Sequence, residues 1–382
     1  MSLFTAKTKL VQISRLLIEN KKVEITINNS TPAYLNDLTT TFRAAIPSVR
    51  DKEIMILIDD LTLPRIPLEI QKSIIPALFN TGANYKTRIT AHSDGLYFQD
   101  YAGEVYKANR DYTEINLGYE FWQLSDDYET CRNIFDDILN KRFELSGRGN
   151  FVGLEEMLDR GDSLEDIGRE IHRLSQAKQL RFLKYYGAKV FIKLCSGDLS
   201  YLLDILGMME LRANKKTPIP IKIQSNVIKN YARNELRSLQ DIKSLHGYPL
   251  YDIAYYFGIW SKSQLVKNNK DYIRIEFPML GLPENLKTAA RELLCYGIFI
   301  DGGFSNMSDG KSARKLLFRR IFTPAFPTTF NDRNTFAMRE SSFKRFIENP
   351  KAFVHERMSE YNISPSDQQV LAQLELGFEI DE

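Results

Sequence analysis

The stretch "KEIMILIDDLTLPRIPLEIQKSIIPALFNTG" (Lys52–Gly82) decides which fold to expect. Its first part, "EIMILIDD", is short and apolar up to two aspartates, which is typical of a strand buried in a parallel sheet. The part "EIQKSIIPALFNTG" has apolar residues at helical spacing and ends at Gly82, which predicts a helix with a kink at Pro76. Acids that end such a strand point into the crevice where open α/β sheets bind their ligands.

The segments on either side continue an alternation of strands and helices. "KKVEITINN" (21–29) alternates as a strand does, and "TPAYLNDLTTTFRAAI" (31–46) has the spacing of a helix. Further along, "YKTRITAHS" (85–93) and "YTEINLG" (112–118) are strand candidates. This alternation predicts an α/β domain over residues 1–124, with a parallel sheet covered by helices on both faces.

The rest of the chain has a different character. Residues 125–240 contain successive segments with helical spacing and predict an all-helical domain, interrupted by the strand-like "IPIKI" (219–223). From 241 to 346, a helix, a strand, a helix and two strands around a glycine- and serine-rich loop predict a winged-helix domain. Residues 347–382 are acidic toward the end and poor in large apolar residues, which predicts a short helix or a partly disordered tail.

Composition excludes several classes of protein. The chain has 382 residues, 43% of them hydrophobic, and a net charge of +2, so its overall charge neither favours nor opposes nucleic acid as a partner. Neither a signal peptide nor a run long enough to span a membrane is evident. The three cysteines and four histidines are scattered, which argues against a zinc site and for reduced thiols. We therefore expect a cytoplasmic protein with no membrane partner.

The paired acids carry the predicted chemistry. In ATPases that transfer phosphate, the first acid at this position holds Mg²⁺ and the second polarises the attacking water, so Asp59 is the candidate metal ligand and Asp60 the candidate catalytic residue. Asp60 is one methylene shorter than the usual glutamate, and misplacement on that scale costs roughly 10²-fold in rate. The alternative is that the pair begins a loop and that Asp60 caps the next helix.

Four stretches, in order, resemble AAA+ ATPases of the origin-recognition/cell-division-cycle type, and in particular their large prokaryotic initiator-like group. "ILIDDLTLPRIPLEIQKSIIPALFN" resembles the Walker B region, and "LYFQDYAGEVYKANRDYTEINLGY" resembles the segment in which Asp111 and Tyr112 introduce the strand after the sensor region. "KLCSGDLSYLLDIL" is similar to the lid-domain motif "SGDiR". "LLFRRIFTPAFPTTFNDRNTFAMRESSF" is similar to the segment that ends the winged-helix region, with Pro324, Phe326 and Arg333 in the matching places.

The resemblance implies a fold and a set of ligands. The fold would be a partial AAA+ parallel-sheet core followed by an all-helical lid and a winged-helix domain. The ligands would be ATP and Mg²⁺, with Ser196 and Asp198 of the lid motif near the nucleotide, and DNA. The family's bacterial members suggest roles around mobile elements or phage defence.

The departures from the family are equally informative. The glycine-rich phosphate loop should precede Walker B, yet no glycine occurs before Asp59. The decoy "GFSNMSDGKS" has the wrong glycine spacing, so its Lys311 is better placed at a wing tip, and Ser200 stands where the lid motif has an arginine. Two explanations stay open: a truncated or split chain whose phosphate loop lies in an upstream reading frame, or a naturally degenerate ATPase. Besides DNA, the expected partner is another copy of the chain in a homo-oligomer or an upstream polypeptide that bears the phosphate loop.

Local charge predicts where DNA would bind. Between Lys287 and Arg345 there are eleven lysines and arginines against five acids, on the region expected to form the winged helix. A solvated surface that offsets the acidic tail is the alternative. The candidate DNA-binding residues are Lys311, Arg314, Lys315, Arg319, Arg320 and Arg333.

Two functions therefore compete. The first is an AAA+-type ATPase module, truncated or degenerate, with a DNA-binding winged-helix region. The second is a non-catalytic scaffold that binds DNA or protein and keeps the ATPase fold as architecture. A nuclease built on Asp59, Glu69 and Lys72 is discounted, because the spacing has one residue too many and the context is helical.

Overall fold

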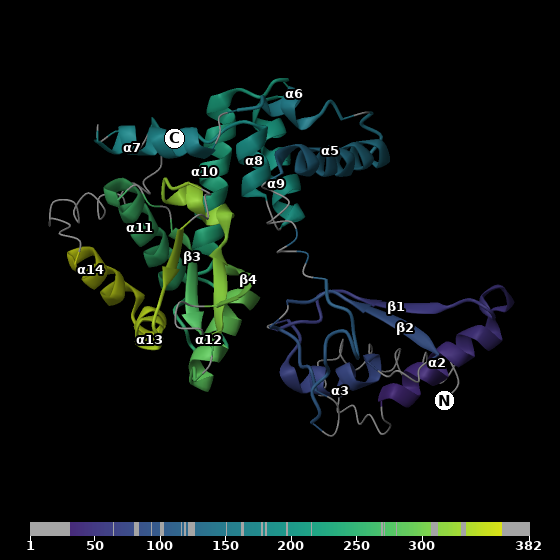
Figure 1. Cartoon of the computed structure of the whole chain (residues 1–382). Helices are drawn as coiled ribbons and strands as arrows, with labels where there is room; N and C mark the ends of the chain where they lie inside the picture. Colours follow the sequence, from purple (N-terminus) through teal and green to yellow (C-terminus); the bar gives the residue numbers. More distant parts are fainter. Residues whose placement is uncertain are drawn as a thin grey trace, which may run out of the picture. The chain divides into compact units, whose positions relative to one another are not determined.

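The computed structural model describes residues 31–360 with the gaps given below, and these residues fall into two compact units, 31–115 and 117–360, which are described separately (Figure 1). The fold is mixed α/β, with a small parallel sheet in the first unit and a mixed four-stranded sheet in the second. Gaps in the description are residues 64, 80–83, 93, 100–102, 116, 118–119, 121–126, 150, 162–163, 177–178, 180–181, 196–197, 215, 269, 271, 280, 307–311 and 330–333, together with the side chains of 31–34, 49, 164–165, 175–176 and 359–360.

The first unit alternates helices and strands as predicted. Its two strands pair in parallel and in register, from Ile54 opposite Tyr85 to Ile58 opposite Ile89. The strand predicted at 21–29 lies outside the described residues. The elements are α2 (Thr31–Ala45), η1 (Pro47–Val49), β1 (Ile54–Ile58), α3 (Leu68–Leu78) and β2 (Tyr85–Ile89).

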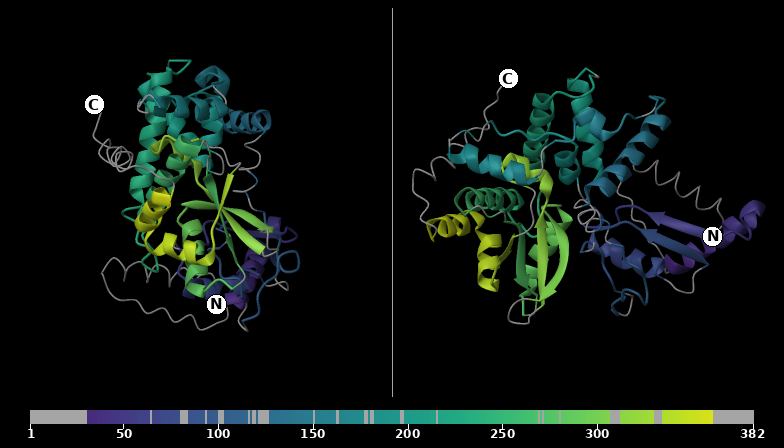
Figure 2. Two further views of the ribbon diagram at one scale, coloured as in Figure 1. Left: turned by 60° about the vertical axis from the view of Figure 1, so that its left-hand side comes forward. Right: turned by 45° about the horizontal axis from the view of Figure 1, so that its top comes forward.

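Strand β1 is covered by helices on one face of the described pair only, which corrects the expectation of a strand buried on both faces. Helices α2 and α3 lie on the same side of the strands (Figures 1 and 2), where Ile58 and Ile89 pack near Ile75. On the other face Leu57 is 71% exposed and Met55 42%. The apolar run thus predicted the strand but not its environment, because burial depends on which other elements pack against it.

The strand predicted at 112–118 is also wrong for its described part. Tyr112 makes a single bridge to Ala108, and residues 113–115 have no regular structure. Instead, Tyr106 and Tyr112 both contact Phe79 at the end of α3. The Tyr106 ring stacks on Phe79 at 4.7 Å between ring centroids, and the Tyr112 ring meets it edge-on at 5.6 Å. The segment therefore packs as a loop against the helix.

The second unit begins with helices and ends with a sheet and two further helices. Its α10 begins at Ile221 after Pro220, so the predicted strand "IPIKI" (219–223) is instead the start of a helix. The elements are α5 (Tyr128–Leu145), α6 (Leu154–Leu158), α7 (Leu164–Gln176), α8 (Ala188–Leu194), α9 (Leu199–Arg212), α10 (Ile221–Ser238), α11 (Leu250–Asn268), β3 (Tyr272–Pro278), α12 (Glu284–Cys295), β4 (Phe299–Asn306), β5 (Ser312–Phe318), η3 (Arg320–Ala325), β6 (Asn334–Ala337), α13 (Glu340–Glu348) and α14 (Pro350–Glu360).

The sheet of this unit has the strand order β4-β5-β3-β6 (Figure 2). β4 and β3 both run antiparallel to β5, and β6 joins β3 in parallel. Phe257 of α11 contacts Phe318 at 4.9 Å and Phe299 at 5.3 Å between ring centroids, so the helix and the sheet share a core. The predicted boundary at residue 240 consequently falls inside one compact unit.

The beginning of the predicted acidic tail is structured. α14 covers 350–360 and buries Phe353, Val354 and Met358, whereas 361–382 lie outside the described residues. α14 packs along α11, and Phe353 also contacts Phe346 of α13 at 5.7 Å between centroids.

Among the helices that the structure describes, none has both the length and the apolar character that a bilayer crossing requires.

Helix α11 is buried on most sides and carries a lysine in its interior. Lys262 is only 4% exposed, between the buried Ser261 and Ser263. Burial lowers the pKa of the Lys262 ammonium to about 7, since no charged group of the described chain contributes to offset the desolvation. The usual value of 10.5 applies in the unfolded chain, so the unfolded chain binds more protons between these two pH values.

We predict that this lysine makes the fold more stable as pH rises from about 7 to about 10.5, by on the order of 1 kcal/mol per pH unit, with its full cost present below pH 7. Lys262→Met should raise the free energy of unfolding at pH 7 and flatten this slope, as measured by urea unfolding across the pH range. Lys267→Met, at an exposed position of the same helix, is the control. Equal stability and slope in wild type and Lys262→Met would show that the ammonium is solvated.

Candidate functional site

The carboxyl ends of β1 and β2 bring the two predicted acids together with a threonine. Asp59 and Asp60 follow β1, and Thr90 follows β2. The Thr90 hydroxyl donates a hydrogen bond to the Asp59 carboxylate and accepts one from the Asp60 backbone N–H at 2.9 Å. Thr90 was not among the predicted site residues. Its signal was a hydroxyl immediately after the second strand of an expected parallel pair.

Asp60 has an unusual backbone and a cationic partner. Its φ is 55°, in the left-handed region that aspartate tolerates better than most residues. The Arg65 guanidinium donates to its carboxylate at 2.5 Å, with both side chains largely exposed. The alternative that Asp60 caps the next helix is wrong, because α3 begins after Pro67 without a side-chain cap.

A buried glutamine fixes the two loops that follow the strands. Gln71 of α3 is fully buried, and its amide N–H groups donate to the carbonyls of Ile66 and Gly95, both at 2.9 Å. Its amide oxygen accepts the Tyr97 backbone N–H at 2.8 Å. A Cβ at Gly95 would lie 1.8 Å from the Thr62 hydroxyl, so the loops meet where only glycine fits. Gln71 therefore links the loops that follow Asp60 and Thr90.

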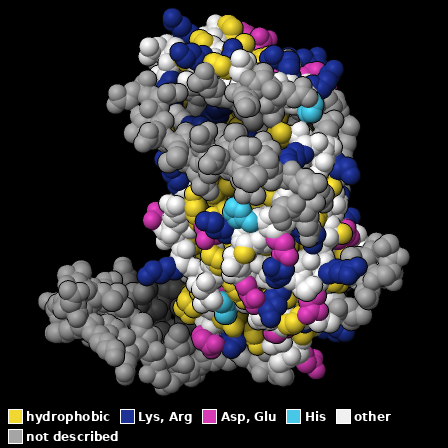
Figure 3. All heavy atoms as spheres, turned by 90° about the vertical axis from the view of Figure 1, so that its left-hand side faces the viewer, with side chains coloured by type: hydrophobic (Ala, Val, Ile, Leu, Met, Phe, Trp, Pro, Cys, Tyr) yellow, Lys and Arg dark blue, Asp and Glu magenta, His cyan; other side chains and the backbone are white. Residues whose placement is uncertain are grey.

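The chemistry of this edge fits Mg²⁺ in part. Carboxylate and hydroxyl oxygens are suitable ligands, and Mg²⁺ commonly uses one or two carboxylates with water and phosphate oxygens for the rest. The Asp59 side chain is exposed and could therefore bind a metal ion, whereas the Asp60 carboxylate is already paired with Arg65. Within the described residues no group of three or more histidine, cysteine or acidic side chains could hold a metal, and histidines on the face in Figure 3 lie apart from one another.

The lid-motif acid is engaged elsewhere. Asp198 caps α9: one carboxylate oxygen accepts the Ser200 backbone N–H at 2.9 Å and the other accepts Arg319 at 2.8 Å. Ser196 lies outside the described residues. Asp198 belongs to the second unit and the acids at 59 and 60 to the first. Its predicted nucleotide contact is corrected to a helix cap and ion pair, because both oxygens are already bonded.

Arg319 is the centre of a polar network that joins α9, α10 and the sheet. Besides bonding to Asp198, the Arg319 guanidinium donates to the Tyr201 hydroxyl at 3.0 Å. Its central carbon lies 5.2 Å from the centroid of the Tyr201 ring. The Tyr201 hydroxyl donates to Glu235 of α10 at 3.3 Å. Burial raises the pKa values of both Tyr201 and Glu235. These groups form a partly buried structural link.

Three of the six predicted DNA contacts are internal. Arg319 is held as described, Arg320 is 2% exposed, and Arg314 is 8% exposed with an ion pair to Asp301 at 2.9 Å. These three assignments are corrected, because Arg314 and Arg320 are buried and the partly exposed Arg319 is held by Asp198 and Tyr201. Lys315 is partly exposed. Lys311 and Arg333 lie outside the described residues.

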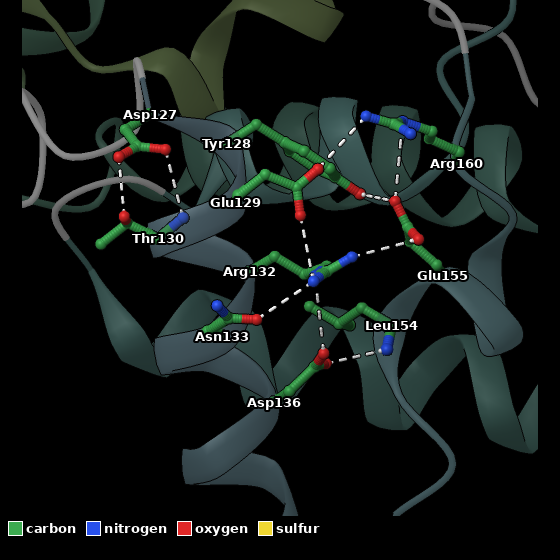
Figure 4. A network of polar contacts seen from close by, with 10 residues as sticks. All are labelled: Asp127, Tyr128, Glu129, Thr130, Arg132, Asn133, Asp136, Leu154, Glu155 and Arg160. Atoms are coloured by element: carbon green, nitrogen blue, oxygen red, sulfur yellow. Dashed lines mark hydrogen bonds and ion pairs between the residues drawn. The ribbon is translucent and has the colours of Figure 1, made fainter.

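A second network, which the sequence did not predict, surrounds the start of α5 (Figure 4). Arg132 contacts Glu129 at 3.0 Å and Glu155 at 3.2 Å, and Arg160 contacts Glu129 at 3.2 Å. The Tyr128 hydroxyl donates to Glu155 at 2.8 Å. The network ties α5 to α6 and the loop that follows it. Its charged groups point at one another rather than into a shared cavity, so we interpret it as structural.

Comparisons with models of protein families, with curated proteins and with solved structures gave no significant match.

We predict that Arg319→Ala lowers the free energy of unfolding by about 1–3 kcal/mol, because it leaves a partly buried carboxylate without its partner. In a double-mutant cycle with Asp198→Asn, the two losses should be strongly non-additive. Urea unfolding provides the measurement. Lys315→Ala is the comparison, with a loss below about 0.5 kcal/mol expected at a partly exposed position. An Arg319→Ala variant that keeps its stability but binds DNA more weakly would restore the original assignment.

Proposed function

We propose that this chain is an AAA+-type ATPase module, truncated or degenerate, whose first unit keeps the magnesium side of a nucleoside triphosphate site. The observation that carries the proposal is the hydrogen bond between Thr90 and Asp59 at the carboxyl ends of two parallel strands. Ligands of open α/β sheets bind at that edge. Neighbouring strand ends with an acid and a hydroxyl side by side are what a hydrated magnesium nucleotide needs.

Each residue has a distinct task in this proposal. Asp59 would hold Mg²⁺, which when bound neutralises phosphate charge. The Thr90 hydroxyl orients the Asp59 carboxylate through its hydrogen bond. Asp60 would position the water, and Gln71 keeps the supporting loops in place. Turnover should be slow, because Asp60 is short and its carboxylate is shared with Arg65.

The phosphate side of the site has to come from elsewhere. No glycine lies between Met1 and Asp59, so backbone N–H groups in that segment cannot form the usual glycine-lined cradle. A polypeptide that bears a phosphate loop would complete the site. The exposed Met55 and Leu57 on the outer face of β1 are compatible with such a partner.

The sheet of the second unit supports the winged-helix part of the proposal. Its order β4-β5-β3 contains an antiparallel hairpin beside a strand that precedes α12, as a winged helix requires. DNA remains the proposed partner. Of the six residues expected to contact it, the described ones that are partly exposed are Lys315 and Arg319, and Arg319 is held by Asp198.

A scaffold without nucleotide is the second candidate. It is favoured by the internal partners of both acids: Thr90 bonds to Asp59, and Arg65 bonds to Asp60. In that case the pair stabilises the loops after β1 and β2, and DNA or protein binding is the whole function.

We predict saturable, Mg²⁺-dependent binding of a fluorescent ATP analogue to the full chain, weakened about tenfold or more by Asp59→Ala through loss of one charged ligand. Glu53→Ala is the matched control, because it removes the same charge just before the opposite end of β1. Asp60→Glu should raise the rate of hydrolysis, by up to about 10²-fold.

Absence of saturable binding by the wild-type chain, or equal weakening by Asp59→Ala and Glu53→Ala, would reject the nucleotide site and leave the scaffold.

A further inference from the structure

Strand β2 pairs with β1 on one side, and within the described residues its other edge is open. The Thr90 backbone N–H donates to the Ile58 carbonyl at 2.9 Å, and the Thr90 carbonyl accepts the Leu61 N–H at 3.0 Å, so both Thr90 groups point toward β1. Because this direction alternates along a parallel strand, the backbone groups of Thr87 and Ile89 point to the open edge. An extended segment can add to such an edge through main-chain hydrogen bonds.

The two faces of this edge strand differ in chemistry. On the inner face, the Thr87 hydroxyl donates to the Leu78 carbonyl of α3 at 2.9 Å. Ile89 packs at the rim of the apolar cluster on the same face and stays partly exposed. On the outer face, Lys86 and Arg88 are both exposed. An added strand would therefore meet an apolar rim on one face and two cations on the other.

The charge on the outer face is available to an acidic strand. Among the described residues Arg88 has no ion-pair partner. Lys86 contacts Glu53 at 2.8 Å, and both side chains are more than half exposed. An exposed pair of this kind contributes little to stability, so Lys86 can exchange Glu53 for another carboxylate. Opposite charges directly across two strands stabilise their pairing, which favours an acidic neighbour for β2.

The end of the sequence has the complementary pattern. "LELGFEIDE" (374–382) lies outside the described residues, and its apolar residues alternate with acids or glycine at the period of a strand. In an extended conformation, Phe378 and Ile380 share one face, while Glu379 and Asp381 share the other. The segment thus combines an apolar face with an acidic face, as the open edge of β2 requires.

The spacing of the charges also matches. Glu379 and Asp381 are two positions apart, as are Lys86 and Arg88. Each acid can therefore lie opposite one of the cations whether the added strand runs parallel or antiparallel to β2. In both directions Ile380 lies opposite the inner-face position 87.

We propose that the chain's own segment 374–382 adds as a strand to the open edge of β2, with its acids on Lys86 and Arg88. Residues 361–373 would be the tether from α14, and thirteen extended residues span up to about 45 Å. A tether of this length keeps the segment at a high effective concentration near the edge. The added strand would cover backbone groups that otherwise invite pairing between copies. The inference does not depend on the nucleotide site.

Amide hydrogen exchange followed by NMR tests the inference, in the full chain and in a variant that ends at Gln373. We expect the amides of Thr87 and Ile89 to exchange at least tenfold more slowly in the full chain, because the added strand accepts their hydrogen bonds. The amides of Lys86 and Arg88 are the internal control. They point toward β1 and should change less than threefold.

A charge exchange in the full-length chain identifies the contact. Lys86→Glu with Arg88→Glu should abolish the slow exchange at positions 87 and 89. Adding Glu379→Lys and Asp381→Lys to that variant should restore it, because the opposite charges have traded places. Arg50→Glu with Lys52→Glu is the matched control: it changes the same charge at exposed positions before β1 and should leave the slow exchange intact.

Three results would overturn the inference. The first is equal exchange at positions 87 and 89 in the full chain and in the variant that ends at Gln373. The second is a combined charge exchange that fails to restore slow exchange, or a control pair that abolishes it. The third is protection that rises with protein concentration, which would show that a second copy supplies the strand.

Discussion

The parallel pairing of β1 with β2 is the constraint on which the first unit depends. It places two strand ends at one edge, and the side chains that follow them, Asp59 and Thr90, become hydrogen-bonded. An antiparallel pair would send them to opposite ends. Gln71 then fixes the loops, because its buried amide would lose three backbone partners if they moved. The proposed nucleotide edge follows from backbone topology rather than from the acids alone.

The second unit shows how packing redistributes charge. Its helices and sheet share one hydrophobic core around Phe257. Some arginines of this unit pair with carboxylates within the folded chain. Arg314 with Asp301 and Arg319 with Asp198 are two such pairs. A buried ion pair contributes little net stability, but removing either member lowers the stability of the fold because it leaves the other charge buried without a partner. Basic residues in a stretch of sequence therefore do not identify a basic surface.

The sequence predicted local structure better than environment. The apolar run before Asp59 and the helical spacing of residues 68–78 correspond to β1 and α3, since strand and helix formation depend largely on neighbouring residues. Thr90 could not be assigned to the site from spacing, because it lies thirty-one positions from Asp59 and meets it only through strand pairing. "IPIKI" alternates like a strand, yet Pro220 begins a helix whose apolar side meets the core.

Burial was the least predictable property. Leu57 belongs to an apolar run but is 71% exposed, and Arg320 belongs to a basic run but is 2% exposed. Both outcomes are set by partners distant in the sequence. A single sequence carries little information on which helix covers a sheet face or which carboxylate meets an arginine. The two acids therefore follow a strand end, as predicted, whereas the residues that surround them were not predicted.

The central claim is that magnesium nucleotide meets the chain at the carboxyl ends of β1 and β2. Paramagnetic broadening by Mn²⁺ with ATP, in the full chain with isoleucine and threonine methyl groups labelled for NMR, tests it most directly. The account predicts that the Ile58 and Thr90 signals broaden at much lower Mn²⁺ concentrations than the signal of Ile54, at the other end of the same strand. Equal broadening at Ile54 and Ile58, or none at either, would contradict it.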